Sequence, residues 1–130
     1  MKTLFTAIAL TAFLVCPSCG IAQTTKAPTD LSVDAFKSAI ATGKARLVDV
    51  RTPAEYAAGH VQGSINMDWT AEDFEAEFAR LDKNMPLLLY CHSGGRSEQA
   101  LEYLTERGYK AQHMAGGFAA WKKAGNPSVK

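Results

Sequence analysis

The sequence has little charge imbalance and no long apolar run, and each absence excludes a class of protein. Fourteen lysine and arginine residues face 13 aspartate and glutamate residues, and no basic stripe carries interleaved aromatic residues. Nucleic acid is therefore not expected as a partner. No apolar run reaches the roughly 20 residues that a membrane-spanning helix needs, so we predict no transmembrane domain. A chain of 130 residues suits one small domain and leaves little room for a second.

Residues 1–22 are typical of an export signal. Lys2 precedes an apolar stretch over residues 4–15, and small residues lead to Ala22, as at a secretory cleavage site. We therefore expect an exported protein, either periplasmic or lipid-anchored to the envelope. Two kinds of processing stay open, namely cleavage after Ala22 and lipid attachment at Cys19.

Cysteine is scarce outside this segment. Cys16 and Cys19 form a C-x-x-C pair, which in a folded domain is typical of a redox motif, but both lie inside the predicted export signal. Beyond a polar linker over residues 23–30, the predicted domain over residues 31–130 keeps Cys91 alone. A lone thiol forms no internal disulfide, even in an oxidising compartment. Cys91 is then either a small buried apolar residue or a reactive thiolate.

Helical and extended patterns alternate along the predicted domain. Ser32 is predicted to cap a helix that ends near Gly43, Thr52 and Glu55 to form a capping box for a second helix, and Thr70 to cap a third. Buried strands are predicted at residues 46–50, 86–90 and 111–114, an extended segment within 60–67, and helices over 97–107 and 118–124. This alternation predicts an α/β fold, with a small parallel sheet flanked by helices on both faces.

The loop after the most apolar strand candidate carries the lone cysteine. It reads CHSGGRS, from Cys91 to Ser97. Binding sites in open α/β sheets lie outside the carboxyl ends of the strands. Gly94 and Gly95 are expected to take positive φ values and to bring successive backbone N–H groups around one point. Such a nest at a helix N-terminus attracts anions and lowers the pKa of a thiol, and Arg96 adds a fixed positive charge.

This loop predicts a nucleophilic thiolate at Cys91 that faces a bound anionic group. At the mouth of the loop, the thiolate is expected to be exposed and prone to oxidation. The arginine follows the cysteine at a C-x4-R spacing, whereas cysteine phosphatases have a longer C-x5-R loop suited to a tetrahedral phosphate. The shorter loop resembles the active loop of the rhodaneses. By itself this spacing is a weak signal.

Two further motifs make the resemblance to the rhodanese family specific. Residues 47–67, LVDVRTPAEYAAGHVQGSINM, resemble its first signature, and residues 116–127, GGFAAWKKAGNP, resemble its closing signature. The resemblance therefore extends from about residue 31 to residue 127. The matching positions are Asp49, Arg51, Glu55, Tyr56, Gly59, His60, Gly63 and Asn66 in the first motif, and Gly116, Gly117, Trp121, Ala124, Gly125 and Pro127 in the second.

The resemblance implies an exported, single-domain thiosulfate sulfurtransferase with a rhodanese-like fold. Cys91 would attack the outer sulfur of a small anionic donor such as thiosulfate and pass the sulfur to cyanide or a thiol acceptor. The intermediate would be a covalent persulfide on Cys91, so neither a cofactor nor a metal ion is expected. The substrate-binding residues would be His92, Ser93, Gly94, Gly95, Arg96 and Ser97, and Asp49 and Arg51 would support the loop.

Two other functions stay open on the sequence alone. A rhodanese-like module could carry sulfur or bind a partner without turnover, although many family members of that kind lack the cysteine. A redox enzyme or a phosphatase could use the same thiolate, but a disulfide oxidoreductase with Cys91 alone would need an external thiol. Among the histidines, His92 could touch substrate or tune the thiolate, His60 is expected to be structural, and His113 has no partner that the sequence identifies.

Overall fold

The structure, a computed structural model, describes residues 28–130. The predicted export signal, with Cys16 and Cys19, lies outside the described residues, as does most of the predicted linker. Five parallel strands form one sheet in the order β1-β5-β4-β2-β3. The strands are β1 (Asp30–Leu31), β2 (Arg46–Asp49), β3 (Ile65–Asn66), β4 (Leu87–Tyr90) and β5 (Ala111–Met114).

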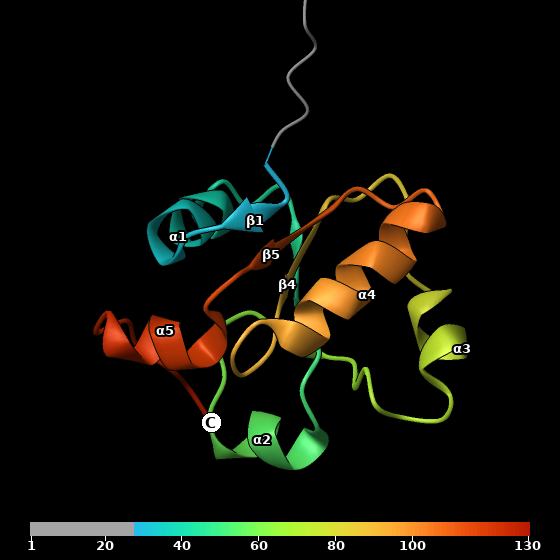
Figure 1. The fold of residues 1–130 in the computed structure, drawn as a ribbon. Coiled ribbons are helices and arrows are strands. Elements are labelled where there is room, and N and C mark those ends of the chain that lie inside the picture. The colour runs from blue at the N-terminus through green and yellow to red at the C-terminus, as the bar shows by residue number, and fades with distance from the viewer. Residues whose placement is uncertain (1–27) are drawn as a thin grey trace, which may run out of the picture.

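Helices follow the strands and cover both faces of the sheet (Figure 1). They are α1 (Val33–Ala41), α2 (Pro53–Ala58), α3 (Phe74–Phe78), α4 (Gly95–Glu106) and α5 (Gly117–Lys123). Figure 1 shows α1 and α5 on one side of β4 and β5, and α4 and α3 on the other. The predicted α/β architecture is confirmed.

Strand β4 divides the core into two layers. Leu87 and Leu89 pack in the layer under α3 and α4, whereas Leu88 and Tyr90 pack in the layer under α1 and α5. The division arises because successive side chains of a strand point to opposite faces. All four residues are buried, as expected for a strand in the middle of a parallel sheet that is covered on both faces.

Two of the three predicted helix caps are present in the structure. The Ser32 hydroxyl caps α1, and Thr52 and Glu55 form a reciprocal capping box at the start of α2. The prediction for Thr70 is wrong, because α3 begins further along the chain and the Thr70 hydroxyl donates instead to the Asp68 carboxylate, at 2.6 Å. A local side-chain acceptor here competes with helix formation.

Strand β1 was not predicted from the sequence. Its two residues were expected at the junction of the linker and the first helix, but they pair in parallel with β5, Asp30 beside His113 and Leu31 beside Met114. A strand of two residues is too short for the alternation of apolar and polar residues to show. The pairing places Asp30 beside His113 of β5, the strand that follows α4.

The strand order reverses between β2 and β4. After β2 the chain adds β3 on one side and then crosses over to β4 on the other. In open α/β sheets the crevice at the carboxyl ends of two such strands is the usual binding site. Cys91 follows β4 and Arg51 follows β2, so the two predicted site segments meet at this point. Helix α2 lies beyond the same end of the sheet (Figure 1).

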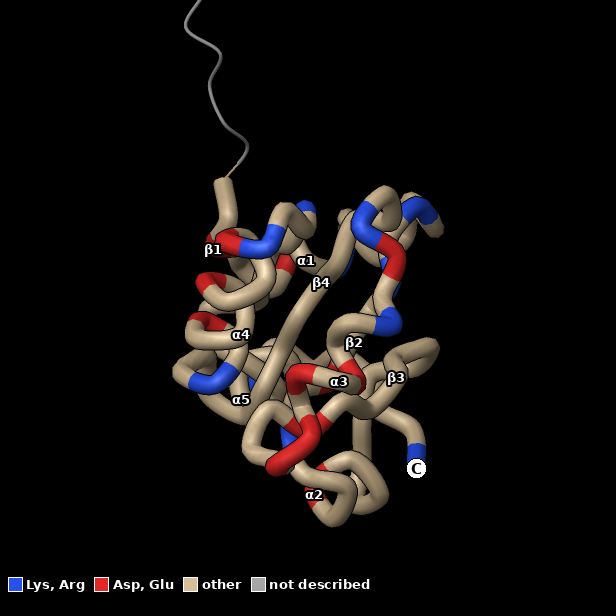
Figure 2. The backbone as a smooth tube through the Cα atoms, turned by 90° about the vertical axis from the view of Figure 1, so that its right-hand side faces the viewer, with Lys and Arg blue, Asp and Glu red and all other residues tan. Residues whose placement is uncertain are grey.

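Charges of both signs are distributed over the surface of the described domain. Figure 2 shows acidic residues gathered along the α3 segment, whose first turn holds Glu75 and Glu77. Within residues 28–130, no helix has both the length and the apolar character that a membrane crossing requires.

Candidate active site

Cys91 lies directly after β4 and is 1% exposed. The expectation of an exposed thiolate is therefore wrong. The sulfur lies at the base of its loop, in the core layer under α4. The loop folds over the end of the strand, so the side chain faces inward while the neighbouring His92 and Ser93 are exposed.

Polar hydrogen-bond donors nevertheless point at the Cys91 sulfur. The Gly94 N–H donates to Sγ at 3.0 Å, and the Ser97 hydroxyl lies 3.6 Å from it. Burial raises the pKa of the Cys91 thiol, but hydrogen bonds from the Ser97 hydroxyl and from the N–H groups of Ser97, Gly94 and Ser93 lower it by more. The pKa therefore lies below its ordinary value, because the loop replaces water as the solvation shell of the thiolate.

The two glycines of the loop differ in conformation. Gly94 is the N-cap of α4 and has a φ of +111°, and a Cβ atom there would collide with the Ala115 carbonyl oxygen. Gly95 is already the first residue of α4, without a positive φ, and a Cβ atom there would meet open space. The prediction of positive φ is confirmed for Gly94 and wrong for Gly95. Only Gly94 is required by the backbone.

Helix α5 holds the loop from the side opposite α4. The Phe118 N–H donates to the Cys91 carbonyl at 2.7 Å, and the Ala119 N–H donates to the His92 carbonyl at 3.0 Å. These two bonds use N–H groups that the first turn of a helix leaves without partners. Gly117, with a φ of +63°, allows α5 to approach, since a Cβ atom there would strike the His92 backbone. The closing motif therefore fixes the loop by backbone contacts.

Arg96 pairs with Glu55 of the first motif. Its two terminal nitrogens lie 2.8 Å and 2.9 Å from the two Glu55 carboxylate oxygens. These hydrogen bonds lower the pKa of Glu55 to about 2, and Glu55 in turn raises the pKa of Arg96. The pair ties the first turn of α4 to α2. Both terminal nitrogens of Arg96 are thereby engaged within the protein.

Asp49 and Arg51, which were expected to support the loop, form a buried ion pair. The Arg51 guanidinium lies 2.7 Å from an Asp49 carboxylate oxygen and also donates to the Gly59 carbonyl at 2.7 Å. The guanidinium carbon of Arg51 also lies 4.3 Å from the centroid of the Phe118 ring, over which it packs. Burial lowers the pKa of Arg51, but the hydrogen bonds and charge of Asp49 raise it above its ordinary value. Arg51 thus joins β2, α2 and α5 beneath the loop.

An open hollow of about 480 Å³ lies beside the loop. Its cationic side chains are Arg51 at the base and Lys122, exposed on the last turn of α5. Lys122 was not predicted as a site residue, because an exposed lysine near a helix end is usually a solvated surface residue. The hollow is lined by Arg51, Glu55, Ala58, Gly59, His92, Phe118, Ala119 and Lys122.

His113 of β5, for which the sequence identified no partner, has two in the structure. It is 3% exposed, its Nδ1 lies 2.9 Å from the Ser97 hydroxyl oxygen, and its Nε2 lies 3.1 Å from an Asp30 carboxylate oxygen. No spacing pattern could reveal these contacts, because they join residues from three separate elements. His60, in contrast, has the structural environment that was expected, stacked on Tyr56 with its Nδ1 2.9 Å from the Tyr56 carbonyl.

These features define a small α/β domain built around a buried, activated cysteine loop. Within residues 28–130, no group of three histidine, cysteine, aspartate or glutamate side chains is arranged to hold a metal ion. The rhodanese-like domain family model matches residues 32–124, and the chain belongs to that family.

Individual relatives agree with this assignment. A sulfurtransferase of Allochromatium vinosum is 36% identical over 84 residues, which are 64% of this chain and 77% of the relative. A rhodanese-related protein from Thermoplasma volcanium has a TM-score of 0.70 at 25% identity, over 77% of this chain and 96% of its own. A rhodanese-like domain protein from Staphylococcus aureus has a TM-score of 0.65 at 28% identity, over 72% and 90%.

Proposed function

We propose that the protein is a sulfurtransferase that carries sulfane sulfur as a persulfide on Cys91. The observation that carries the proposal is the set of donors around the sulfur. The Ser97 hydroxyl and the N–H groups of Ser97, Gly94 and Ser93 hold the pKa of the thiol below its ordinary value, with the Gly94 N–H 3.0 Å from Sγ. Membership of the rhodanese-like family and the similarity to a sulfurtransferase support sulfur transfer as the reaction.

In the first half-reaction the Cys91 thiolate attacks the outer sulfur of an anionic donor, for which we propose thiosulfate. A bond forms between Sγ and that sulfur, the sulfur–sulfur bond of the donor breaks, and its electron pair leaves with sulfite. The N–H groups that face Sγ in the resting loop are already in place to stabilise an anionic sulfur, so little reorganisation accompanies the step.

In the second half-reaction a nucleophile removes the outer sulfur. Cyanide would give thiocyanate and a thiol would give a new persulfide, and in each case Cys91 leaves as a thiolate. A thiol with a lowered pKa is the better leaving group, so the same donors assist this step as well.

The surroundings of the loop indicate how the donor is bound. Because Arg96 uses both terminal nitrogens on Glu55, we assign it to holding the loop and to supplying positive charge near Cys91. The hollow beside the loop offers His92 and Lys122 to the anionic end of the donor. Because Cys91 is 1% exposed, its sulfur is better suited to attack on a slender terminal atom than to attack on a crowded phosphoester.

The near-complete burial of Cys91 also favours a second candidate function. A domain that receives sulfur and presents it to a partner protein gains from a shielded persulfide, since solvent oxidants reach it slowly. Turnover with free thiosulfate would then be poor although sulfur is still loaded. From residues 1–22 we further propose that the protein works after export, in the periplasm or lipid-anchored to the envelope.

The test is steady-state formation of thiocyanate from thiosulfate and cyanide by the full chain and by Cys91→Ser. We expect turnover by the wild type and none by the variant, with His60→Asn as a control in a residue outside the loop and the hollow. Turnover that survives in Cys91→Ser would overturn the proposal. Stoichiometric sulfur loading without turnover would select the carrier function, and hydrolysis of an aryl phosphate that depends on Cys91 would select a phosphatase.

A further inference from the structure

Behind the nucleophile a line of hydrogen bonds runs from Cys91 to the edge of the sheet. The Ser97 hydroxyl lies 3.6 Å from Cys91 Sγ, His113 Nδ1 lies 2.9 Å from that hydroxyl, and Asp30 lies 3.1 Å from His113 Nε2. The His113 side chain is 4% exposed, whereas that of Asp30 is 66% exposed. The line therefore connects a buried sulfur to a carboxylate in contact with water.

The contact with Asp30 determines which proton His113 can gain. A carboxylate only accepts hydrogen bonds, so the 3.1 Å contact places a proton on His113 Nε2. The nitrogen that gains or loses a proton is then Nδ1, which faces Ser97. When Nδ1 is bare it accepts from the Ser97 hydroxyl, and when it is protonated it donates to that hydroxyl.

The Ser97 hydroxyl has one proton and three neighbouring acceptors. These are the Gly94 carbonyl at 3.0 Å, His113 Nδ1 at 2.9 Å and Cys91 Sγ at 3.6 Å. A bare Nδ1 draws the proton away from the sulfur. A protonated Nδ1 no longer accepts, which leaves the Ser97 proton for the other two acceptors, and a thiolate attracts it more strongly than a thiol does.

We propose that His113 is a positioning residue for the nucleophile, which takes up through Ser97 the proton that Cys91 loses on ionisation. The thiol proton passes to the Ser97 oxygen while the Ser97 proton passes to His113 Nδ1. Ser97 ends as a neutral hydroxyl that donates to the thiolate, and the imidazolium rests against the Asp30 carboxylate. No proton enters or leaves the set of four residues, and no co-reactant is needed.

This inference rests on the proposed role of Cys91 as a thiolate nucleophile, and it adds two residues to the machinery. The elements packed against β5 supply charged groups near this line. Strand β1 supplies Asp30, and α4 supplies Arg96, whose charge acts on Cys91 while its hydrogen bonds go to Glu55. Helix α1 presents the apolar Phe36 to the opposite core layer.

The experiment is a pH titration of Cys91 ionisation, followed by the ultraviolet absorbance of the thiolate. The spectrum of the matching Cys91→Ser protein is subtracted in each background, which removes the contributions of Cys16, Cys19 and the tyrosines. His113→Asn keeps a hydrogen-bonding side chain that cannot gain the proton. Asp30→Asn keeps an acceptor for Nε2–H but removes the charge that stabilises the imidazolium.

We expect the midpoint of Cys91 ionisation to rise by about one pH unit in His113→Asn, which is about a tenfold loss of thiolate at any pH below the midpoint. A smaller rise in the same direction is expected for Asp30→Asn. His60→Asn, a control histidine whose ring contacts Tyr56, should leave the midpoint unchanged. A purely structural role of His113 would lower the melting temperature without moving the midpoint.

The inference is overturned if Cys91 ionises at the wild-type midpoint in both variants. Should His113→Asn fail to fold, the exposed Asp30 provides the decisive variant, because its replacement disturbs no core packing. The titration needs no sulfur donor, so its result is independent of whether the protein transfers sulfur. If both variants form thiocyanate normally and the midpoint does not move, the proposed role of His113 is wrong. The proposed function would still hold.

Discussion

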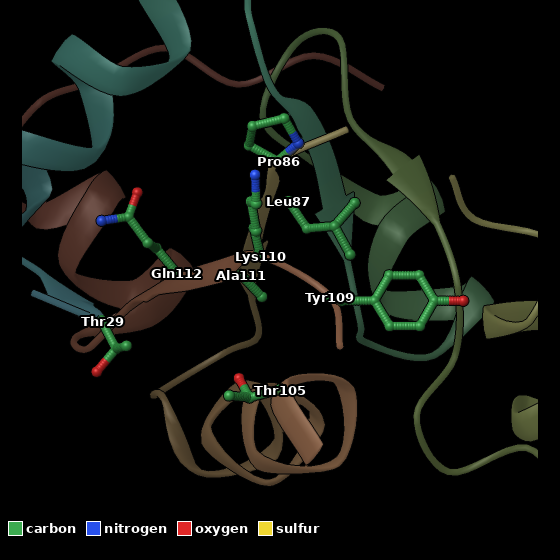
Figure 3. Close-up of a pocket in the computed structure, with 8 residues that line it drawn as sticks. All are labelled: Thr29, Pro86, Leu87, Thr105, Tyr109, Lys110, Ala111 and Gln112. Atoms are coloured by element: carbon green, nitrogen blue, oxygen red, sulfur yellow. The ribbon is translucent and has the colours of Figure 1, made fainter. Parts of the chain in front are cut away.

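Both ends of the sheet carry a hollow, but polar groups converge on a reactive side chain at only one end. At the amino ends of β4 and β5 the hollow is about 350 Å³ and is lined by Thr29, Pro86, Leu87, Thr105, Tyr109, Lys110, Ala111 and Gln112 (Figure 3). Polar groups there serve the chain itself, as when the Gln112 amide donates to the Pro28 carbonyl at 2.6 Å. Figure 3 shows side chains of this hollow spread apart, without a common point toward which their polar ends turn.

At the carboxyl ends of β2 and β4 the polar groups converge. The loop and the start of α4 direct the N–H groups of Ser93, Gly94 and Ser97 at Cys91, and the first turn of α5 donates to the carbonyls of the same loop. Helices that follow parallel strands begin at this end, so their free N–H groups and positive dipole ends all meet here. The polarity of the parallel sheet therefore determines at which end an anionic sulfur can be held.

The largest effect should come from removing the conformation that aims the donors. Gly94→Ala is expected to lower sulfur transfer by about two orders of magnitude or more, the usual loss when one preorganised donor is withdrawn. The left-handed φ and the collision with the Ala115 carbonyl oxygen both oppose the substitution. Thiocyanate formation and the Cys91 ionisation midpoint are the measurements.

Two control glycines sharpen this test of the comparison. Gly95→Ala has open space and no positive φ, so stability should change by less than about 1 kcal/mol. Gly108→Ala, at the amino end with a φ of +86°, should cost about 1–2 kcal/mol of stability yet leave Cys91 ionisation unchanged. Equal losses of sulfur transfer in Gly94→Ala and Gly108→Ala would contradict the claim that only the carboxyl end of the sheet serves the reaction.

A second large effect is expected at the buried ion pair under the loop. Asp49→Asn should lower the free energy of unfolding by about 3–5 kcal/mol, because it leaves Arg51 charged and without its counter-ion. Urea denaturation measures the change. Glu77→Gln, which breaks a pair on the exposed side chain of Arg80, should cost no more than about 1 kcal/mol. Similar losses of unfolding free energy in Asp49→Asn and Glu77→Gln would mean that burial does not determine how much the Asp49–Arg51 pair stabilises the fold.

The smallest effect should come from the Glu55–Arg96 pair and should depend on pH. The folded-state pKa of Glu55 is about 2, below its ordinary value of 4.5, so its contribution is present above pH 4.5 and is lost as the pH falls toward 2. Partial exposure limits this contribution to about 1 kcal/mol. The difference in unfolding free energy between wild type and Glu55→Gln should shrink across this window. A difference in unfolding free energy that stays constant with pH would contradict a stabilising contribution from the Glu55–Arg96 pair.

Features formed by residues close together in the chain could be predicted from the sequence. The apolar run after Pro86 predicted β4, the Ala111–Met114 strand has the expected bounds, and the Thr52–Glu55 capping box formed as predicted. The contiguous loop likewise identified Cys91 together with the donors beside it. Such features depend on local periodicity and on turns of a few residues, which a sequence shows directly.

Contacts between distant elements lay beyond the sequence. Arg96 meets Glu55, and His113 meets both Ser97 and Asp30, only after the sheet has brought separate loops to one end. The burial of the cysteine has the same origin, since it depends on how α4 and α5 close over the loop. Tertiary packing, which no spacing rule encodes, therefore supplied the second half of the site.

The most direct test of the central claim is the mass of the full chain before and after incubation with thiosulfate, and then with cyanide. The account predicts a gain of one sulfur atom, located on the peptide that contains Cys91, removed by cyanide and absent in Cys91→Ser. The opposite result is a Cys91 that titrates as a reactive thiolate and gains no sulfur from the donor. That outcome would contradict a sulfur-carrying role for this loop.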